Sequence, residues 1–199
     1  MTCRRALALT LAVSFALGLG ACTDDDEPSD PTDPTDETVA PGETVTVDLG
    51  AGLEADLPGD WVVEQAFTAP EDPGGECTVV PASLGTGSGF VSLHLPAAVC
   101  ADEPQDAPLN GEHGDYITIE DVPDPREVAD VEVPLGPATT FLQDYEECTQ
   151  ECVFTEDRIA LVALDPPIGE GYPTLMVQVD SEVLSESEVL ELLGAIHRA

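Results

Sequence analysis

The stretch Ser185-Glu186-Ser187-Glu188-Val189-Leu190-Glu191-Leu192-Leu193 decides the fold class, because it predicts one amphipathic helix after a long series of strands. Ser185 and Glu188 form a capping box, a pattern that satisfies amide groups left unpaired at a helix start. Leu184 and Val189 flank the cap in the positions of a hydrophobic staple. The apolar face of the helix is expected to comprise Val189, Leu190, Leu192, Leu193 and Ile196.

His197 and Arg198 follow this face and are expected to complement the helix C-terminus, where positive charge is favoured. We expect the helix to pack across a sheet, since the domain core needs that apolar stripe. A helix that binds a partner is the alternative.

Strand patterns fill the chain before the helix. Alternation of apolar and polar residues, together with β-branched and aromatic content, predicts most of these strands. They are expected at residues 45–49, 53–57, 61–67, 77–80, 90–95, 116–119, 128–133, 139–147, 153–164 and 174–179. Turns or loops are expected at 58–60, 85–89 and 166–171, and residues 96–115 are expected to be irregular. The predicted class is α+β: a mainly antiparallel sheet with a C-terminal amphipathic helix packed on it.

Leu19-Gly20-Ala21-Cys22 ends a short apolar run that follows Arg4 and Arg5. The run is too short to span a bilayer comfortably, and the small residues after it suit signal processing. The four residues match a lipobox, so residues 1–21 are predicted to be a lipoprotein signal peptide and Cys22 the lipidated residue. An ordinary secretory signal is the alternative. A diacylglycerol and a further acyl chain on Cys22 would anchor the protein stably.

Residues 22–43 are predicted to be a disordered tether that begins at the lipidated cysteine. The segment is acidic, contains the repeat Pro31-Thr32-Asp33-Pro34-Thr35-Asp36 and has no aromatic residue, so it cannot bury a core. At polyproline pitch it would reach on the order of 60 Å from the membrane. Residues 44–199 are then one globular domain by length.

The cysteines are predicted to form two disulfides, because lipidation of Cys22 and loss of Cys3 leave four of the six. Three pairings are possible, and we favour Cys77–Cys100 and Cys148–Cys152, since the second pair flanks a hairpin-sized loop. A zinc site that combines these cysteines with His94 or His113 is the alternative. Export and the spacing of the pairs argue against it.

The chain carries 41 acidic residues against 5 arginines and no lysine, and its net charge is −36. Such a field argues against binding of nucleic acid or anionic lipid headgroups by the domain. It is compatible with a cationic partner, diffuse divalent-cation binding or a solvated surface that resists association. No calcium-loop or cofactor motif occurs, so no cofactor is expected. The lysine-free composition points to a GC-rich genome.

The sequence offers a few candidate catalytic residues. Ser88 in Gly87-Ser88-Gly89 invites a hydrolase interpretation, with His94 or His113 as base and Asp115 as its orienting acid. Position 86 is Thr and no helix follows, so the nucleophile-elbow pattern is incomplete and Ser88 is expected to be a turn residue. His113 could also join acids around a metal ion. Arg126 and Arg158 could clamp an anion, although neutralisation of neighbouring carboxylates is the simpler role.

The lipobox with its acidic tether, the turn Leu57-Pro58-Gly59-Asp60-Trp61 and the terminal strands closed by a helix resemble the LpqN family of actinobacterial lipoproteins. The resemblance covers residues 44–199. It implies a PsbP-like α/β/α sandwich and a non-enzymatic role in the cell envelope, and it transfers no catalytic residue. A β-sandwich carrying one helix is the alternative fold.

The sequence therefore predicts a lipoprotein at the extracytoplasmic face of the cell membrane. Its domain is expected to be a non-enzymatic binding module for an envelope protein or a small ligand. A cell-envelope hydrolase with a site near Ser88 or His113 is the alternative. The expected partners are the membrane, through the lipid anchor, and that protein or ligand; nucleic acid is not expected.

Overall fold

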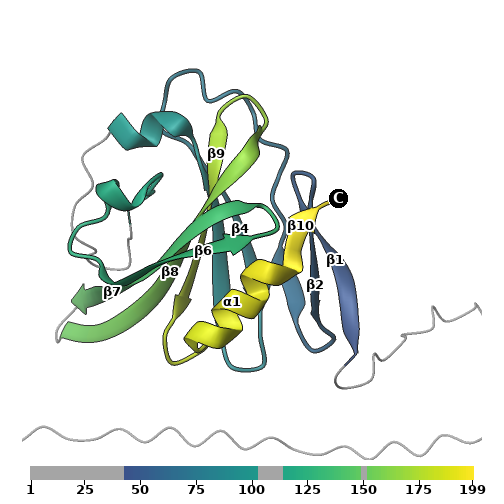
Figure 1. Cartoon of the computed structure of the whole chain (residues 1–199), viewed down its shortest axis with the longest axis vertical. Coiled ribbons are helices and arrows are strands. Elements are labelled where there is room, and N and C mark those ends of the chain that lie inside the picture. Colours follow the sequence, from purple (N-terminus) through teal and green to yellow (C-terminus); the bar gives the residue numbers. More distant parts are fainter. Residues whose placement is uncertain (1–42, 103–113, 149–151) are drawn as a thin grey trace, which may run out of the picture. The chain divides into compact units, whose positions relative to one another are not determined.

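Two antiparallel sheets carry the fold of the residues that the computed structural model describes, which are 43–102, 114–148 and 152–199. The larger sheet has the strand order β3-β4-β5-β9-β8-β7-β6, and the smaller has the order β1-β2-β10 (Figure 1). The strands are β1 (Thr44–Gly50), β2 (Leu53–Pro58), β3 (Val62–Gln65), β4 (Val79–Gly85), β5 (Phe90–Pro96), β6 (Arg126–Val133), β7 (Gly136–Cys148), β8 (Cys152–Ile168), β9 (Tyr172–Asp180) and β10 (Ile196–Arg198).

The prediction of a mainly antiparallel sheet with one C-terminal helix is confirmed for these residues. The helix α1 (Glu186–Ala195) begins at Ser185 with the predicted capping box and lies beside β2 and β10. It buries Val189, Leu192 and Leu193, and burial of such side chains stabilises by roughly 1.5–3 kcal/mol each. Leu184, the other member of the predicted staple, is also buried in the larger core.

Both faces of the seven-stranded sheet are covered around β8. Ala160 and Val162 belong to a large core that the two sheets and α1 share. Ile159 and Leu161, which point to the opposite face, belong to a smaller core with Tyr116, Val122, Phe141 and Met176. A strand buried on both faces is expected to be apolar throughout, as residues 159–162 are.

A close backbone contact joins the two sheets at Gly50. The amide of Phe67, which follows β3, donates to the carbonyl of Leu49 in β1 at 2.7 Å. Gly50 has φ +82°, and a Cβ there would lie 2.1 Å from the Phe67 carbonyl oxygen. Only glycine fits at this position, since another side chain would push the two sheets apart.

The segment at residues 116–119, predicted to be a strand, is not one. Tyr116 is buried in the smaller core, and Ile119–Asp121 form a short 3₁₀ helix. The carboxylate of Asp121 accepts bonds from the amide and the hydroxyl of Thr118, at 3.0 and 3.2 Å. These local bonds compete with strand pairing and explain why the β-branched pattern fails here.

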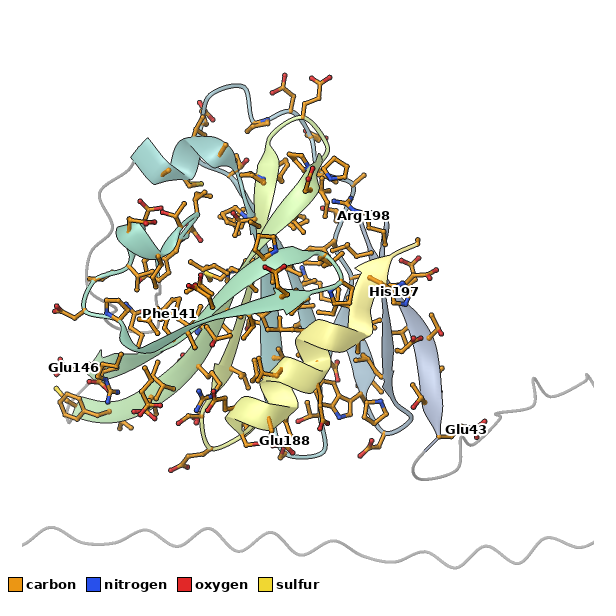
Figure 2. The ribbon with its side chains drawn as sticks, viewed as in Figure 1. Glu43, Phe141, Glu146, Glu188, His197 and Arg198 are labelled. Atoms are coloured by element: carbon orange, nitrogen blue, oxygen red, sulfur yellow. A yellow bond between two sulfur atoms is a disulfide. The ribbon has the colours of Figure 1, made fainter. Side chains whose placement is uncertain are left out.

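The C-terminal prediction was wrong beyond residue 195. Ile196 belongs to β10 rather than to the helix, and His197 and Arg198 pair with β2 instead of complementing the helix C-terminus. Figure 2 shows these two residues on β10, at the opposite end of the helix from Glu188. Ile196 is nonetheless fully buried in the larger core, because the β10 backbone turns it inward. The local helical pattern carried no sign of the pairing with β2, which lies about 140 residues away in the chain.

The loop predicted at 166–171 begins later than expected. β8 continues to Ile168, which pairs with Tyr172, and the register with β9 shifts between Ala163 and Ile168. Arg198 donates to the carbonyl of Pro166 in this irregular part of β8. The two prolines fall in the irregular stretch, where a missing amide disrupts no regular ladder.

Candidate functional site

Ser88 lies in the turn between β4 and β5, as the sequence predicted. Its amide donates to the hydroxyl of Thr86 at 3.2 Å, and its own hydroxyl donates to the Val183 carbonyl at 3.4 Å. His94 is four residues beyond Phe90 along β5, about 13 Å at strand rise. The structure therefore does not bring Ser88 and His94 together as a nucleophile and its base.

The other predicted catalytic residues are dispersed or not described. His94 is half-buried on β5, opposite Pro81 and Met176 in register. Asp115 is half-buried just before Tyr116. His113 lies outside the described residues, so its interpretation stays a prediction.

Arg126 neutralises neighbouring carboxylates, which is the role favoured from the sequence. Its guanidinium contacts Asp144 on β7 and Glu156 on β8, with a distance of 2.6 Å to Glu156. The hydrogen bond to Glu156 raises the pKa of Arg126 above its ordinary value, so the charge is permanent. Arg158 is half-buried on β8 between Leu142 and Val179 in register.

Cys77 and Cys100 form the predicted disulfide. Cys152 is also disulfide-bonded, and Cys148 lies directly opposite it in the β7–β8 register. The sulfurs of Cys77, Cys100 and Cys152 are thus in disulfides rather than in the thiolate form that binds zinc. Among the described residues no group of three metal-ligating side chains comes together. Cys22 and the predicted tether up to residue 42 lie outside the described residues, and Glu43, the last residue of the predicted tether, accepts a hydrogen bond from the amide of Gly59 at 2.8 Å.

A groove between α1 and β2 is the strongest candidate site. It arises because β10 pairs with β2 only at residues 53–55, which leaves the rest of β2 open toward the helix. Its volume is about 320 Å³, within the range of small-molecule pockets. The lining residues are Thr44, Asp56, Leu57, Pro58, Trp61, Glu188, Glu191, Leu192 and Ala195.

The helix contributes one continuous face to this groove. Glu188, Glu191, Leu192 and Ala195 follow the spacing i, i+3, i+4 and i+7, which aligns side chains on one side of a helix. The opposite wall combines Leu57 with Trp61, the only tryptophan of the chain. The groove lining therefore combines apolar side chains with the acidic residues Asp56, Glu188 and Glu191.

Three carboxylates make the groove lining negative. Hydrogen bonds from the Ser185 hydroxyl and amide lower the pKa of Glu188, which keeps it ionised at neutral pH. Asp56 accepts a bond from the hydroxyl of Thr46 at 2.6 Å, and its other oxygen lies 3.7 Å from Nε2 of His197. Glu191 is exposed on α1 and also lines the groove.

The groove lining combines three carboxylates with an indole and aliphatic side chains. An indole beside carboxylates suits a ligand that carries a positive charge on an apolar body, because the ring face attracts cations and the acids attract them further. Sequence reasoning missed Asp56, Trp61 and Glu191 as site residues. The helical spacing of Glu188, Glu191 and Leu192, which places them on one face of the helix, was the sequence signal that could have indicated this wall of the groove.

No family model, curated protein or solved structure matches the chain. The part of the chain that is described contains no helix with the length and apolar character needed to cross a membrane.

Proposed function

We propose that this chain is a membrane-anchored extracytoplasmic lipoprotein whose domain is a non-enzymatic binding module. The groove between α1 and β2 is its binding site, and a small ligand with an apolar body and a positive charge is its occupant. The observation that carries this proposal is the position of Trp61 beside Glu188 and Glu191 in one groove. The net charge of −36 adds long-range attraction for a cationic ligand.

The anchor follows from the lipobox at Leu19-Gly20-Ala21-Cys22. The acidic tether at residues 22–43 would hold the groove away from the membrane surface and let it meet ligands in the envelope. Kinship with the LpqN family is part of the proposal, and its support is the Leu57–Trp61 turn together with the C-terminal helix. A PsbP-like sandwich would require helices on both faces of the sheet. The described residues contain the one α-helix, α1.

Native mass spectrometry of the full chain, isolated from its own membranes under mild conditions, tests the proposal. We expect a stoichiometric extra mass that belongs to an amine or quaternary ammonium compound. The Trp61→Ala variant should carry no extra mass, and a smaller fraction of the Glu191→Gln molecules should carry it. The matched control is Glu186→Gln, which removes an equivalent exposed charge from the same helix outside the groove. A chain that carries no extra mass, or an anionic one, would contradict the proposal.

The hydrolase alternative has its own test. If Ser88 or His113 were catalytic, Ser88→Ala or His113→Ala would abolish hydrolysis of an envelope ester without lowering stability. The turn hydrogen bonds of Ser88 favour a structural role instead. We therefore expect Ser88→Ala to leave any hydrolysis unchanged, and an unchanged rate in His113→Ala as well would end the hydrolase interpretation.

A further inference from the structure

The hairpin of β7 and β8 extends beyond its neighbours in the sheet. β9 pairs with β8 as far as Asp157, opposite Asp180, and β6 pairs with β7 as far as Leu142. Among the described residues, residues 153–155 of β8 therefore pair along one edge only, with β7. In Figure 1 this end of the hairpin lies away from β1, β2 and β10.

The second edge of β8 is oriented to accept another strand. The amide of Ser181 donates to the carbonyl of Glu156 at 2.8 Å, which is the last bond that the chain after β9 makes along this edge. Backbone groups of alternate residues point to the same edge of a strand. The amide and carbonyl of Phe154 consequently point outward from the same edge of β8 as the carbonyl of Glu156, beyond the last bond from Ser181.

A hollow of about 550 Å³ lies along this edge. Its lining residues are Asp144, Val153, Phe154, Thr155, Glu156, Asp180, Ser181 and Glu182. Phe154 is 70% exposed and Val153 is 59% exposed. Natural edge strands are usually protected by lysine, proline or a covering segment, so two large apolar residues here indicate a surface that is covered by a partner.

The charge of the hollow selects the kind of partner. Four carboxylates line it, and Arg126 contacts two of them, Asp144 and Glu156. Asp180 and Glu182 add their charges at the point where β9 ends. The excess is negative, so the complementary occupant is positively charged. A second copy of the chain is disfavoured, because each copy carries a net charge of −36.

We propose that the β8 edge at residues 153–155 binds an extended segment of a partner protein by strand addition, and that this segment alternates basic with apolar residues. Main-chain bonds to Phe154 supply affinity, and contacts with the Phe154 ring and the acidic side chains supply specificity. This surface is separate from the α1–β2 groove, with which it shares no lining residue. The proposal therefore stands or falls independently of the ligand proposed for the groove.

A synthetic peptide of alternating valine and lysine or arginine tests this inference on the full chain. Titration calorimetry should show one site, and amide hydrogen exchange should slow at Phe154 when the peptide is bound. The same peptide with glutamate in place of its basic residues should not bind. Protection of the Phe154 amide separates strand addition from general attraction between opposite charges.

Matched variants sharpen the result. Phe154→Ala removes the ring, and Phe154→Pro also removes the edge amide, so the proline variant should bind about tenfold more weakly than the alanine variant. Proline is tolerated where the amide faces outward from an edge strand. Phe90→Ala is the control, since Phe90 is 66% exposed on β5 and outside the hollow.

The role of charge is tested by Glu182→Arg, which should weaken peptide binding. The control is Glu170→Arg in the turn between β8 and β9, which should affect peptide binding much less. Thermal unfolding confirms that each variant is folded. Equal binding by Phe154→Ala and Phe154→Pro, or an unprotected Phe154 amide in the complex, would overturn strand addition. Equal binding of the acidic peptide would overturn the proposal that the partner segment is basic.

Discussion

Ser185 and Glu188 each accept a hydrogen bond from the other's backbone amide at the start of α1. The amide of Glu188 donates to the Ser185 hydroxyl oxygen at 3.4 Å, and the amide of Ser185 donates to the Glu188 carboxylate at 2.8 Å. Because α1 forms one wall of the groove, this cap also positions a binding surface. Ser185→Ala should lower the free energy of unfolding by about 1 kcal/mol, measured by denaturant titration. An unchanged unfolding midpoint would show that the cap does not stabilise the domain.

The stability lost in Ser185→Ala should depend on pH, because Glu188 is the ionisable partner of Ser185. Hydrogen bonds from Ser185 lower the pKa of Glu188 below its ordinary value near 4.5, so the folded state favours the ionised carboxylate. This contribution is fully present above that ordinary value and disappears as pH falls through the lowered pKa. The stability difference between the natural chain and Ser185→Ala should therefore be smaller at pH 3 than at pH 7. A constant difference across that range would contradict the assignment.

The Cys77–Cys100 disulfide closes a loop with a sequence separation of 23. The double variant Cys77→Ser and Cys100→Ser should lose about 3 kcal/mol of stability by the chain-entropy estimate. Differential scanning calorimetry of the two chains measures the loss. Pairing of these cysteines with others would instead appear as different disulfide-linked peptides after proteolysis.

Tyr116 is buried in the smaller core and donates to Oε1 of Gln143 at 3.1 Å. Tyr116→Phe should cost about 1 kcal/mol, since it removes one buried hydrogen bond. Burial raises the pKa of Tyr116 above its ordinary value near 10, so its contribution is present below that value and is lost as pH rises through the raised pKa. The stability gap to Tyr116→Phe should narrow in strong base, which denaturant titrations at pH 8 and above pH 10 would detect.

Lipidation at Cys22 predicts where the protein is found. Cys22→Ala should move the chain from the membrane fraction to the soluble fraction of its host, because the acyl chains supply the anchor. Thr23→Ala, one residue further on, is the control and should stay in the membrane. A Cys22→Ala protein that remains in the membrane fraction would show that the lipobox interpretation is wrong.

The parts of the fold that local sequence determines were predictable. Alternation predicted β1, β2 and β5, and the capping box predicted where α1 begins. Both signals depend on residues only a few positions apart, so one sequence suffices to read them. The disulfide Cys77–Cys100 followed from counting cysteines and choosing the more local pairing.

The candidate sites depend on pairing between distant segments, and for that reason they were missed. The groove exists because β10 covers only part of β2, and nothing near Ile196 in the sequence indicates that strand. Trp61 and Glu191 are far apart in the chain and meet only once α1 lies beside β2. The open edge at Phe154 likewise depends on where β9 stops pairing with β8.

The most direct test of the central claim uses Trp61 as its own reporter. Hexyltrimethylammonium, titrated into the full chain, should change the fluorescence of the single tryptophan saturably, whereas hexanoate should not. Glu191→Gln should weaken binding by about threefold, and Glu186→Gln should not. A saturable change with hexyltrimethylammonium alone, sensitive to Glu191, is the result that a cation-binding groove predicts. No change, or equal responses to the cation and the anion, would contradict it.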